Sequence, residues 1–316
     1  MPERGPGTPS RDDFAKRKSL VCLGWGLLGR AENRVVWADD GQSDFGGTIL
    51  AQASPLSMFD ISGKSALIMG ATGSFGRAAS QALAQMGCDV TLADMNPDKL
   101  AAAAEELAPT GANIATVTGL PDTEENAAAI VTAAVEAFGA LDLMFVATGL
   151  NDVGYIEEQS YERWRSVISA NLDGYWLACQ AAGRQFAKQP ADRGRSKVVV
   201  VSSTRGRHGL PTGYTGYCAS KAGLDGMVRA LACEWGSKNA NINAIGPTVF
   251  RSPLSEWMFS DEDPGKATRE AMLERVPVGR LSETDDLVGG LIYLLSPASD
   301  YVTGHTLYID GGYTAE

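Results

Sequence analysis

The chain has 316 residues, of which 44% are apolar and 21% are charged, a balance typical of a globular protein with a full core. Its formal net charge of −11 disfavours nucleic acid or an anionic membrane as a partner. Five widely spaced cysteines and two histidines predict neither a disulfide framework nor a metal site. No window of about 18 consecutive apolar residues occurs, so we expect no membrane span.

The first 57 residues differ in composition from the rest of the chain. They are rich in Pro, Gly and charge, apart from an apolar patch at Ser19–Gly29. Basic residues ahead of an apolar run are compatible with a signal peptide, but this run holds three glycines and no small-residue cleavage site follows it. We therefore expect residues 1–57 to be an extension, disordered or translated from an upstream start. We expect a cytoplasmic domain over residues 58–316.

From Met58 the pattern alternates between strand and helix. Apolar runs predict strands at Ala66–Met69, Asp89–Ala93, Asn113–Thr118, Leu141–Val146, Lys197–Val201, Asn241–Ile245 and Thr306–Ile309. Helical patterns run from the first glycine-rich turn to Met86, and then over Pro97–Ala108, Thr123–Phe138, Tyr161–Lys188, Tyr214–Gly236 and Thr284–Leu295. Strands alternating with helices predict an α/β fold, in which a doubly wound parallel sheet is covered on both faces.

A glycine-rich turn, Gly70-Ala-Thr-Gly73-Ser-Phe-Gly76, follows the first strand and opens a helix. Glycines there let the backbone approach a pyrophosphate, and the start of the helix supplies N–H donors and positive potential. Asp94 ends the second strand, where a carboxylate accepts hydrogen bonds from ribose hydroxyls and repels a 2′-phosphate. The pattern predicts a dinucleotide site that favours NAD over NADP.

Tyr217 and Lys221 stand four residues apart in YCASK, so their side chains share one face of a helix. Tyrosine has an ordinary pKa of about 10, and a neighbouring ammonium favours its phenolate. Such a pair alone is common on protein surfaces. Here it follows KVVVVSS, a buried strand that ends in Ser202 and Ser203, and parallel sheets bind ligands at that end of their strands. The combination indicates acid–base chemistry.

Residues 58–316 resemble the short-chain dehydrogenase/reductase family, in its short single-domain branch. The likeness rests on MFDISGKSALIMGATG, ISANLDGYW, VVVVSST with YCASK, NAIGPTVFRSPL and the closing PVGRLSETDDLVGGLIYLLSPASDYVTGHTLYIDGG. It implies a Rossmann sheet of seven parallel strands in a single domain, a nicotinamide cofactor and a homotetramer. The implied catalytic tetrad is Asn171, Ser203, Tyr217 and Lys221, with Ser202 as a structural neighbour. Implied cofactor contacts come from Gly70, Thr72, Gly73, Ser74, Phe75, Gly76, Asp94, Met95, Ala147, Gly149, Tyr217, Lys221, Pro247, Val249 and Ser252.

The sequence also departs from the family pattern. Met69 replaces a threonine before the glycine turn, and Ser74 stands where the middle glycine is expected. The usual Asn-Asn-Ala-Gly appears as residues 146–149, Val-Ala-Thr-Gly, so we expect Thr148 to replace in part the amides that brace the sheet. The Pro-Gly pair after the sixth strand appears as Pro247-Thr248. These changes bear on cofactor affinity and leave the tetrad intact.

The leading hypothesis is an NAD-dependent oxidoreductase that interconverts a secondary alcohol and a ketone. The segment FRSPLSEWMF and the ending DGGYTAE are similar to those of sugar-acid (gluconate-type) dehydrogenases, which suggests a sugar acid or polyol. An apolar lid of Leu254, Trp257, Met258 and Phe259 would equally suit a hydrophobic or cyclic ketone, or a 3-oxoacyl substrate. Two further hypotheses are that the protein binds a dinucleotide without catalysing a reaction, and that it is an enoyl reductase. Enoyl reductases of this superfamily place the lysine six residues beyond the tyrosine, unlike this chain. We also expect His208 to be an exposed loop residue or a substrate contact.

Overall fold

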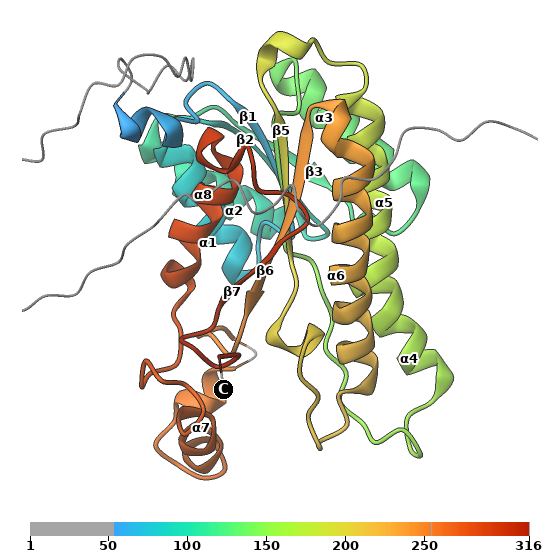
Figure 1. Ribbon diagram of the computed structural model, residues 1–316, viewed down its shortest axis with the longest axis vertical. Helices are drawn as coiled ribbons and strands as arrows, with labels where there is room; N and C mark the ends of the chain where they lie inside the picture. The colour runs from blue at the N-terminus through green and yellow to red at the C-terminus, as the bar shows by residue number, and fades with distance from the viewer. Residues whose placement is uncertain (1–53, 254, 316) are drawn as a thin grey trace, which may run out of the picture. The chain divides into compact units, whose positions relative to one another are not determined.

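The computed structural model describes residues 54–253 and 255–315, so the expectations for residues 1–53 and for Leu254 lie outside it (Figure 1). Within these residues seven parallel strands form one sheet in the order β3-β2-β1-β4-β5-β6-β7. The strands are β1 (Ser65–Met69), β2 (Asp89–Asp94), β3 (Ile114–Thr118), β4 (Leu143–Val146), β5 (Ser196–Val201), β6 (Ala240–Pro247) and β7 (Thr306–Ile309). The strand order reverses between β1 and β4, as in a doubly wound Rossmann sheet, so the predicted fold class is confirmed.

Helices cover both faces of the sheet. Those in the described residues are α1 (Ser74–Gln85), α2 (Pro97–Leu107), α3 (Glu124–Phe138), α4 (Tyr161–Ile168), α5 (Gly174–Phe186), α6 (Thr215–Trp235), α7 (Gly265–Leu273) and α8 (Val288–Leu295). Helices α1, α2 and α8 lie on one side of the sheet, α3, α5 and α6 lie on the other, and α7 stands near the end of the chain (Figure 1).

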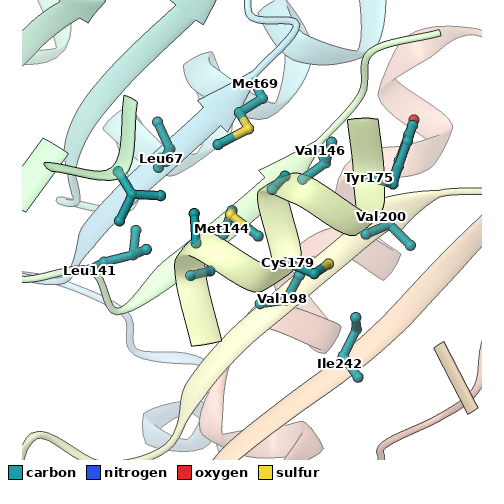
Figure 2. Close-up of a cluster of buried hydrophobic side chains, with 14 of the residues drawn as sticks. Leu67, Met69, Leu141, Met144, Val146, Tyr175, Cys179, Val198, Val200 and Ile242 are labelled. Atoms are coloured by element: carbon teal, nitrogen blue, oxygen red, sulfur yellow. The ribbon is translucent and has the colours of Figure 1, made fainter. Parts of the chain in front are cut away.

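Alternate residues of the buried strands enter two different cores. In β1, Leu67 and Met69 belong to the cluster under α3, α5 and α6, whereas Ala66 and Ile68 belong to the cluster under α1, α2 and α8. Figure 2 shows the first cluster, in which β1, β4, β5 and β6 contribute side chains that lie near α5 and its Tyr175. Because both faces of these strands are apolar, polar groups for chemistry are concentrated where the strands end.

The predicted helix over 161–188 is not one regular helix. Helix α4 ends at Ile168, a π-helical turn over Ser169–Asp173 follows, and α5 continues to Phe186. The π turn contains Asn171, which the resemblance assigns to the catalytic tetrad. Such turns occur often at functional sites, because they redirect backbone groups without ending the helix.

Other helix boundaries shift for local reasons. Thr123, one of the two residues expected to cap this helix, accepts a hydrogen bond from the backbone N–H of Asn126, so the helix itself begins at Glu124. Helix α7 is absent from the sequence prediction because Gly265 is its one buried residue and no apolar period marks it. A 3₁₀ turn over Pro55–Phe59 crosses the expected boundary at residue 57 and packs near a second such turn at Pro297–Ser299.

Candidate active site

Two adjoining clefts open at the carboxyl ends of β1 and β4. The first has a volume of 1430 Å³ and the second 870 Å³. They share as lining residues Thr72, Gly73, Ala147, Thr148, Gly149 and Leu150. These residues follow the two strands at which the sheet order reverses, and open α/β sheets bind ligands at that point. The first cleft exceeds the 300–1,000 Å³ or so that drug-sized ligands occupy, so an elongated ligand fits it.

The glycine turn after β1 is built for close backbone approach. A Cβ atom on Gly70 would lie 2.9 Å from the backbone carbon of Ala147, and one on Gly76 would lie 2.1 Å from the Gly70 carbonyl oxygen. Gly73 precedes α1, lines both clefts and provides no side-chain cap for the first turn of the helix. The helix therefore begins at the cleft, where its uncapped N–H groups suit an anion such as a pyrophosphate.

Asp94 is held beside this turn at the end of β2. Its Oδ2 atom accepts hydrogen bonds from the Thr72 backbone N–H at 3.0 Å and from the Thr72 hydroxyl at 2.8 Å. Its Oδ1 atom accepts one from the Met95 N–H at 2.8 Å, and both Asp94 and Met95 line the second cleft. The carboxylate is thus fixed in the position expected for a ribose-binding acid.

Most residues predicted to contact the cofactor line one or both clefts. They are Gly70, Thr72, Gly73, Ser74, Phe75, Asp94, Met95, Ala147, Gly149, Tyr217, Lys221 and Ser252. Three others line neither cleft. Gly76 is packed inside its turn, Pro247 is buried, and the Val249 carbonyl accepts the Ser282 N–H at 3.3 Å.

The ring of Phe250 is a cleft residue that the sequence analysis missed. It stacks on Phe75 with 3.6 Å between ring centroids, and both rings line the first cleft. The contact joins the glycine turn to the segment after β6, which lies far from it in the sequence. No sequence signal marks such a pairing, because either residue alone reads as an ordinary apolar position.

Ser203, Tyr217 and Lys221 come together between β5 and α6. Ser203 lies two residues after the end of β5, and its Oγ accepts the Arg205 N–H at 3.1 Å. Tyr217 lies in the first turn of α6 and Lys221 one turn later, as their spacing predicts. Tyr217 and Lys221 line the first cleft, while Ser203 is buried beside it. Burial raises the pKa of Tyr217, and hydrogen bonding to the Ser203 side chain and the charge of Arg205 oppose that rise.

In the protein without cofactor, Lys221 does not have the expected effect on the pKa of Tyr217. It is 2% exposed, its Nζ donates to the Val201 carbonyl at 2.7 Å, and this atom lies 5.7 Å from the Tyr217 ring centroid. Burial lowers the pKa of Lys221 to about 7, against the opposing charge of Asp225. The expected lowering of the Tyr217 pKa by Lys221 is therefore not seen, because the buried amine itself resists carrying a charge. Arg205 and Ser203 act on the tyrosine instead.

Asn171 is fully buried and holds the loop after β4. Its Oδ1 accepts the Leu150 N–H and its Nδ2 donates to the Leu150 carbonyl, both at 2.7 Å. Its Nδ2 also reaches the Ser220 hydroxyl at 3.3 Å, and that hydroxyl donates to the Tyr217 carbonyl at 2.8 Å. Asn171 thus joins the π turn, the lining of the cleft and the helix that carries the tyrosine. It lines neither cleft itself.

Three hydroxyls at strand ends are buried and have no partner in the described part of the chain. They belong to Thr148 after β4, Ser202 after β5 and Thr248 after β6. Thr148 therefore does not brace the sheet through its side chain as expected. The Tyr175 hydroxyl donates to the Thr148 carbonyl instead. Thr148 itself lines both clefts, although its hydroxyl oxygen is buried. With the glycine turn and Asp94, it makes a site that fits a nicotinamide dinucleotide.

The expected apolar lid is not formed by the residues described. Met258 is buried, Trp257 is half exposed, and the Arg251 guanidinium lies 3.9 Å from the centroid of the Phe259 ring. None of these three apolar side chains lines either cleft. Of the same segment, the residues that do so are Phe250, Arg251, Ser252, Pro253 and Glu256. This wall of the cleft is therefore more polar than its sequence suggests.

Membrane-spanning helices and metal-binding clusters are both absent from residues 54–253 and 255–315. No helix there is long and apolar enough to cross a membrane. No group of three or more His, Cys, Asp or Glu side chains there is placed to hold a metal ion.

Proteins of known family share this architecture. A family model described as enoyl-(acyl carrier protein) reductase matches residues 70–314. An uncharacterized oxidoreductase of Mycobacterium tuberculosis H37Rv is 49% identical over 272 residues, which are 84% of this chain and 98% of that protein. The 2-dehydro-3-deoxy-D-gluconate 5-dehydrogenase of Dickeya dadantii is 31% identical over 265 residues, 82% and 99% of the two chains.

A solved structure agrees in fold over almost its whole length. The gluconate 5-dehydrogenase from Burkholderia cenocepacia J2315, in complex with NADP and tartrate, matches with a TM-score of 0.76 and 26% identity. The match covers 83% of this chain and 99% of that one. This chain belongs to the short-chain dehydrogenase/reductase family. It is an oxidoreductase of the type that acts on CH–OH groups.

Proposed function

We propose that the protein is an NAD-dependent oxidoreductase that interconverts a secondary alcohol and a ketone on a sugar acid or polyol. The observation that carries the proposal is the convergence of Ser203, Tyr217 and Lys221 at the first cleft. The adjoining second cleft is lined by Asp94, and the two clefts share the glycine turn. A Tyr–Lys spacing of four residues argues against an enoyl reductase. The polar wall from Arg251 to Glu256 argues against a hydrophobic or 3-oxoacyl substrate.

Ser203, Tyr217 and Lys221 together bind one substrate oxygen and move its proton. Tyr217 exchanges a proton with the substrate hydroxyl or carbonyl, and Ser203 donates a hydrogen bond to the same oxygen. Lys221, whose amine gains and loses a proton near neutral pH, is placed to exchange protons with the tyrosine and to bind a ribose hydroxyl. Asn171 keeps the loop after β4 in place around them. The bound nicotinamide supplies the hydride acceptor and a positive ring.

Asp94 supports NAD as the cofactor. Its carboxylate lies at the end of β2 with lone pairs for a ribose diol, and a 2′-phosphate placed there would meet like charge. A solved relative holds NADP, so the preference needs its own test. Arg77 and Lys99 also line the first cleft, and they are the cations that a phosphate would approach.

We further propose a cytoplasmic homotetramer. Helices α4 and α5 expose large aromatic side chains, with Tyr161 77% and Trp176 47% exposed. Exposed apolar faces on long helices commonly pair across symmetric interfaces.

Steady-state assays over a panel of sugar acids, polyols and cyclic ketones, each with NAD and with NADP, test the proposed function. We expect turnover of at least one sugar acid or polyol, with NAD preferred about tenfold or more in kcat/KM, which is about 1.4 kcal/mol of discrimination. Nucleotide binding without turnover of any alcohol or ketone would support the non-catalytic reading instead.

A further inference from the structure

The segment that follows β7 brings a buried tyrosine to the turn after β5. Gly311 and Gly312 have backbone φ angles of 64° and 92°, in the left-handed region that favours glycine, so they form a bend that other residues would strain. The Asp310 carboxylate fixes this bend, because it accepts the Gly312 N–H at 3.0 Å and the Thr314 N–H at 2.9 Å. Tyr313 is thereby packed inward and is 1% exposed.

The Tyr313 hydroxyl is bonded to Arg205, a buried residue of the 3₁₀ turn Thr204–Gly206. Arg205 is 8% exposed, and within the described residues its guanidinium makes one hydrogen bond, from Nη1 to the Tyr313 hydroxyl at 3.1 Å. Its Cζ also lies 5.3 Å from the centroid of the Tyr313 ring, a favourable contact for a cation. Burying a guanidinium is costly unless its donors find partners. The contacts with Tyr313 therefore hold this side chain in place.

The backbone of the same turn fixes the hydroxyl of Ser203. The Arg205 N–H donates to the Ser203 Oγ at 3.1 Å, and the Gly206 N–H donates to the Ser203 carbonyl at 3.0 Å. A serine hydroxyl has one hydrogen to donate and two lone pairs that accept. Because the Arg205 N–H occupies one lone pair, the hydroxyl hydrogen points away from the turn. It is then free to donate to a substrate oxygen.

The turn has little freedom to move by itself. A Cβ on Gly206 would lie 2.5 Å from the Asp225 carboxylate of α6, so the turn has no room to shift toward that helix. His208 follows the turn, and its ring packs edge-on to that of Tyr313 with 6.1 Å between centroids. The position of Ser203 beside α6 therefore depends on where Tyr313 holds the turn.

We propose that Tyr313 is a positioning residue for Ser203 and acts through Arg205. The inference rests on the proposed function, which assigns Ser203 the hydrogen bond to the substrate oxygen. Tyr313 holds the guanidinium, the guanidinium holds its turn, and a backbone N–H of that turn directs the serine hydroxyl. Both residues act from behind the site, since neither of them lines a cleft.

A double-mutant cycle tests this role, with hydride transfer measured in single turnovers. Tyr313→Phe removes the hydroxyl, keeps the ring and should slow hydride transfer by about 3-fold to 10-fold, the range for one hydrogen bond. The KM for NAD should stay within about twofold. In a Ser203→Ala background the same substitution should change the rate by less than about 1.5-fold, because the serine through which it acts is gone.

Tyr308→Phe is the matched control. It removes a tyrosine hydroxyl from β7, where the ring lies 6.0 Å from the guanidinium of Arg207 rather than on Arg205, and it should leave the rate unchanged. Equal losses from Tyr313→Phe with and without Ser203 would overturn the inference, because the tyrosine would then act on the fold as a whole. An unchanged rate in the protein that retains Ser203 would overturn it as well.

Hydrogen exchange in the free protein tests the same contacts without turnover. The backbone N–H groups of residues 205–208 are all hydrogen-bonded to Ser203 or Thr204. They should exchange about 3-fold to 10-fold faster in Tyr313→Phe than in the wild type or in Tyr308→Phe. Unchanged exchange would refute the positioning role even in a protein that oxidises alcohols. Faster exchange in a protein that converts no alcohol or ketone would disprove the proposed function and keep the hold of Tyr313 on the turn.

Arg275→Ala takes the place of Tyr313→Phe if that variant does not fold. Arg275 is exposed, and its guanidinium lies 4.3 Å from the centroid of the Tyr313 ring. Its removal uncovers the ring and leaves the hydroxyl in place. The same pattern is expected at a smaller size: slower hydride transfer only where Ser203 is present, and faster exchange at residues 205–208. Absence of this pattern would overturn the inference.

Discussion

Replacing Lys221 with methionine should make the free protein more stable while abolishing its chemistry. The side chain is 2% exposed, and among the described residues its amine has no carboxylate partner. It donates to the Val201 carbonyl at 2.7 Å and lies 4.9 Å from the centroid of the Tyr175 ring. Methionine has a similar length and shape without an ionisable group. Lys221→Met therefore removes a group whose burial lowers the stability of the folded protein.

The size of the effect follows from the pKa. A fall from 10.5 to about 7, at about 1.36 kcal/mol per pH unit, means that burial disfavours the charged form by about 5 kcal/mol. The variant leaves the Val201 carbonyl without its donor, which costs about 1–3 kcal/mol. The net gain at neutral pH is therefore about 2–4 kcal/mol in the free energy of unfolding.

The sign of the pH dependence provides a second check. Between pH 7 and 10.5 the unfolded chain binds the Lys221 proton and the folded chain does not, so the stability of the wild type rises with pH in this window. The advantage of the variant should shrink accordingly. Urea unfolding without cofactor, at pH values of about 7 and 9.5, measures both quantities.

A Lys221→Met protein that is less stable than the wild type at neutral pH would refute this reasoning. So would an unchanged difference between the two proteins at the higher pH. Either result would mean that the amine is well solvated or compensated in the free protein. The same variant should lose most of the stabilisation that NAD gives the wild type, because Lys221 is assigned a contact with the ribose.

Three other predictions concern the cofactor site and assembly. Gly76→Ala should weaken or abolish NAD binding, because the new Cβ would lie 2.1 Å from the Gly70 carbonyl oxygen. Gly289→Ala in α8 is the control, because a Cβ there meets nothing within 4 Å and should leave NAD binding unchanged. Titration of both variants with NAD measures the two affinities. Asp94→Ala should narrow the preference for NAD over NADP, and an unchanged kcat/KM ratio would show that another group sets it. Light scattering at micromolar concentration should give the mass of a tetramer, and a monomer would contradict the proposed assembly.

The structure could be predicted from the sequence wherever a short local pattern determines the local fold. The turn from Gly70 to Gly76 and the strand that precedes Ser202 and Ser203 were placed correctly, because glycine spacing and apolar runs are local sequence patterns. The four-residue spacing of Tyr217 and Lys221 likewise placed both side chains at the cleft.

Features that depend on tertiary contact could not be predicted in this way. The stacking of Phe250 on Phe75 and the bond from Arg205 to Tyr313 join segments that are distant in the chain. The low pKa of Lys221 comes from burial, which YCASK alone does not reveal. The apolar lid was mispredicted because apolar composition does not tell which way a side chain such as Met258 faces.

We assign Tyr217 as the acid–base group of an alcohol oxidoreductase. Single-turnover formation of NADH from the best alcohol of the panel, by the wild type and by Tyr217→Phe, tests it most directly. The variant removes one hydroxyl and keeps the ring, so NAD affinity should be retained while the rate of hydride transfer falls by about 10²–10⁴-fold. A Tyr217→Phe enzyme that keeps more than a tenth of the wild-type rate would contradict the assignment of this tyrosine.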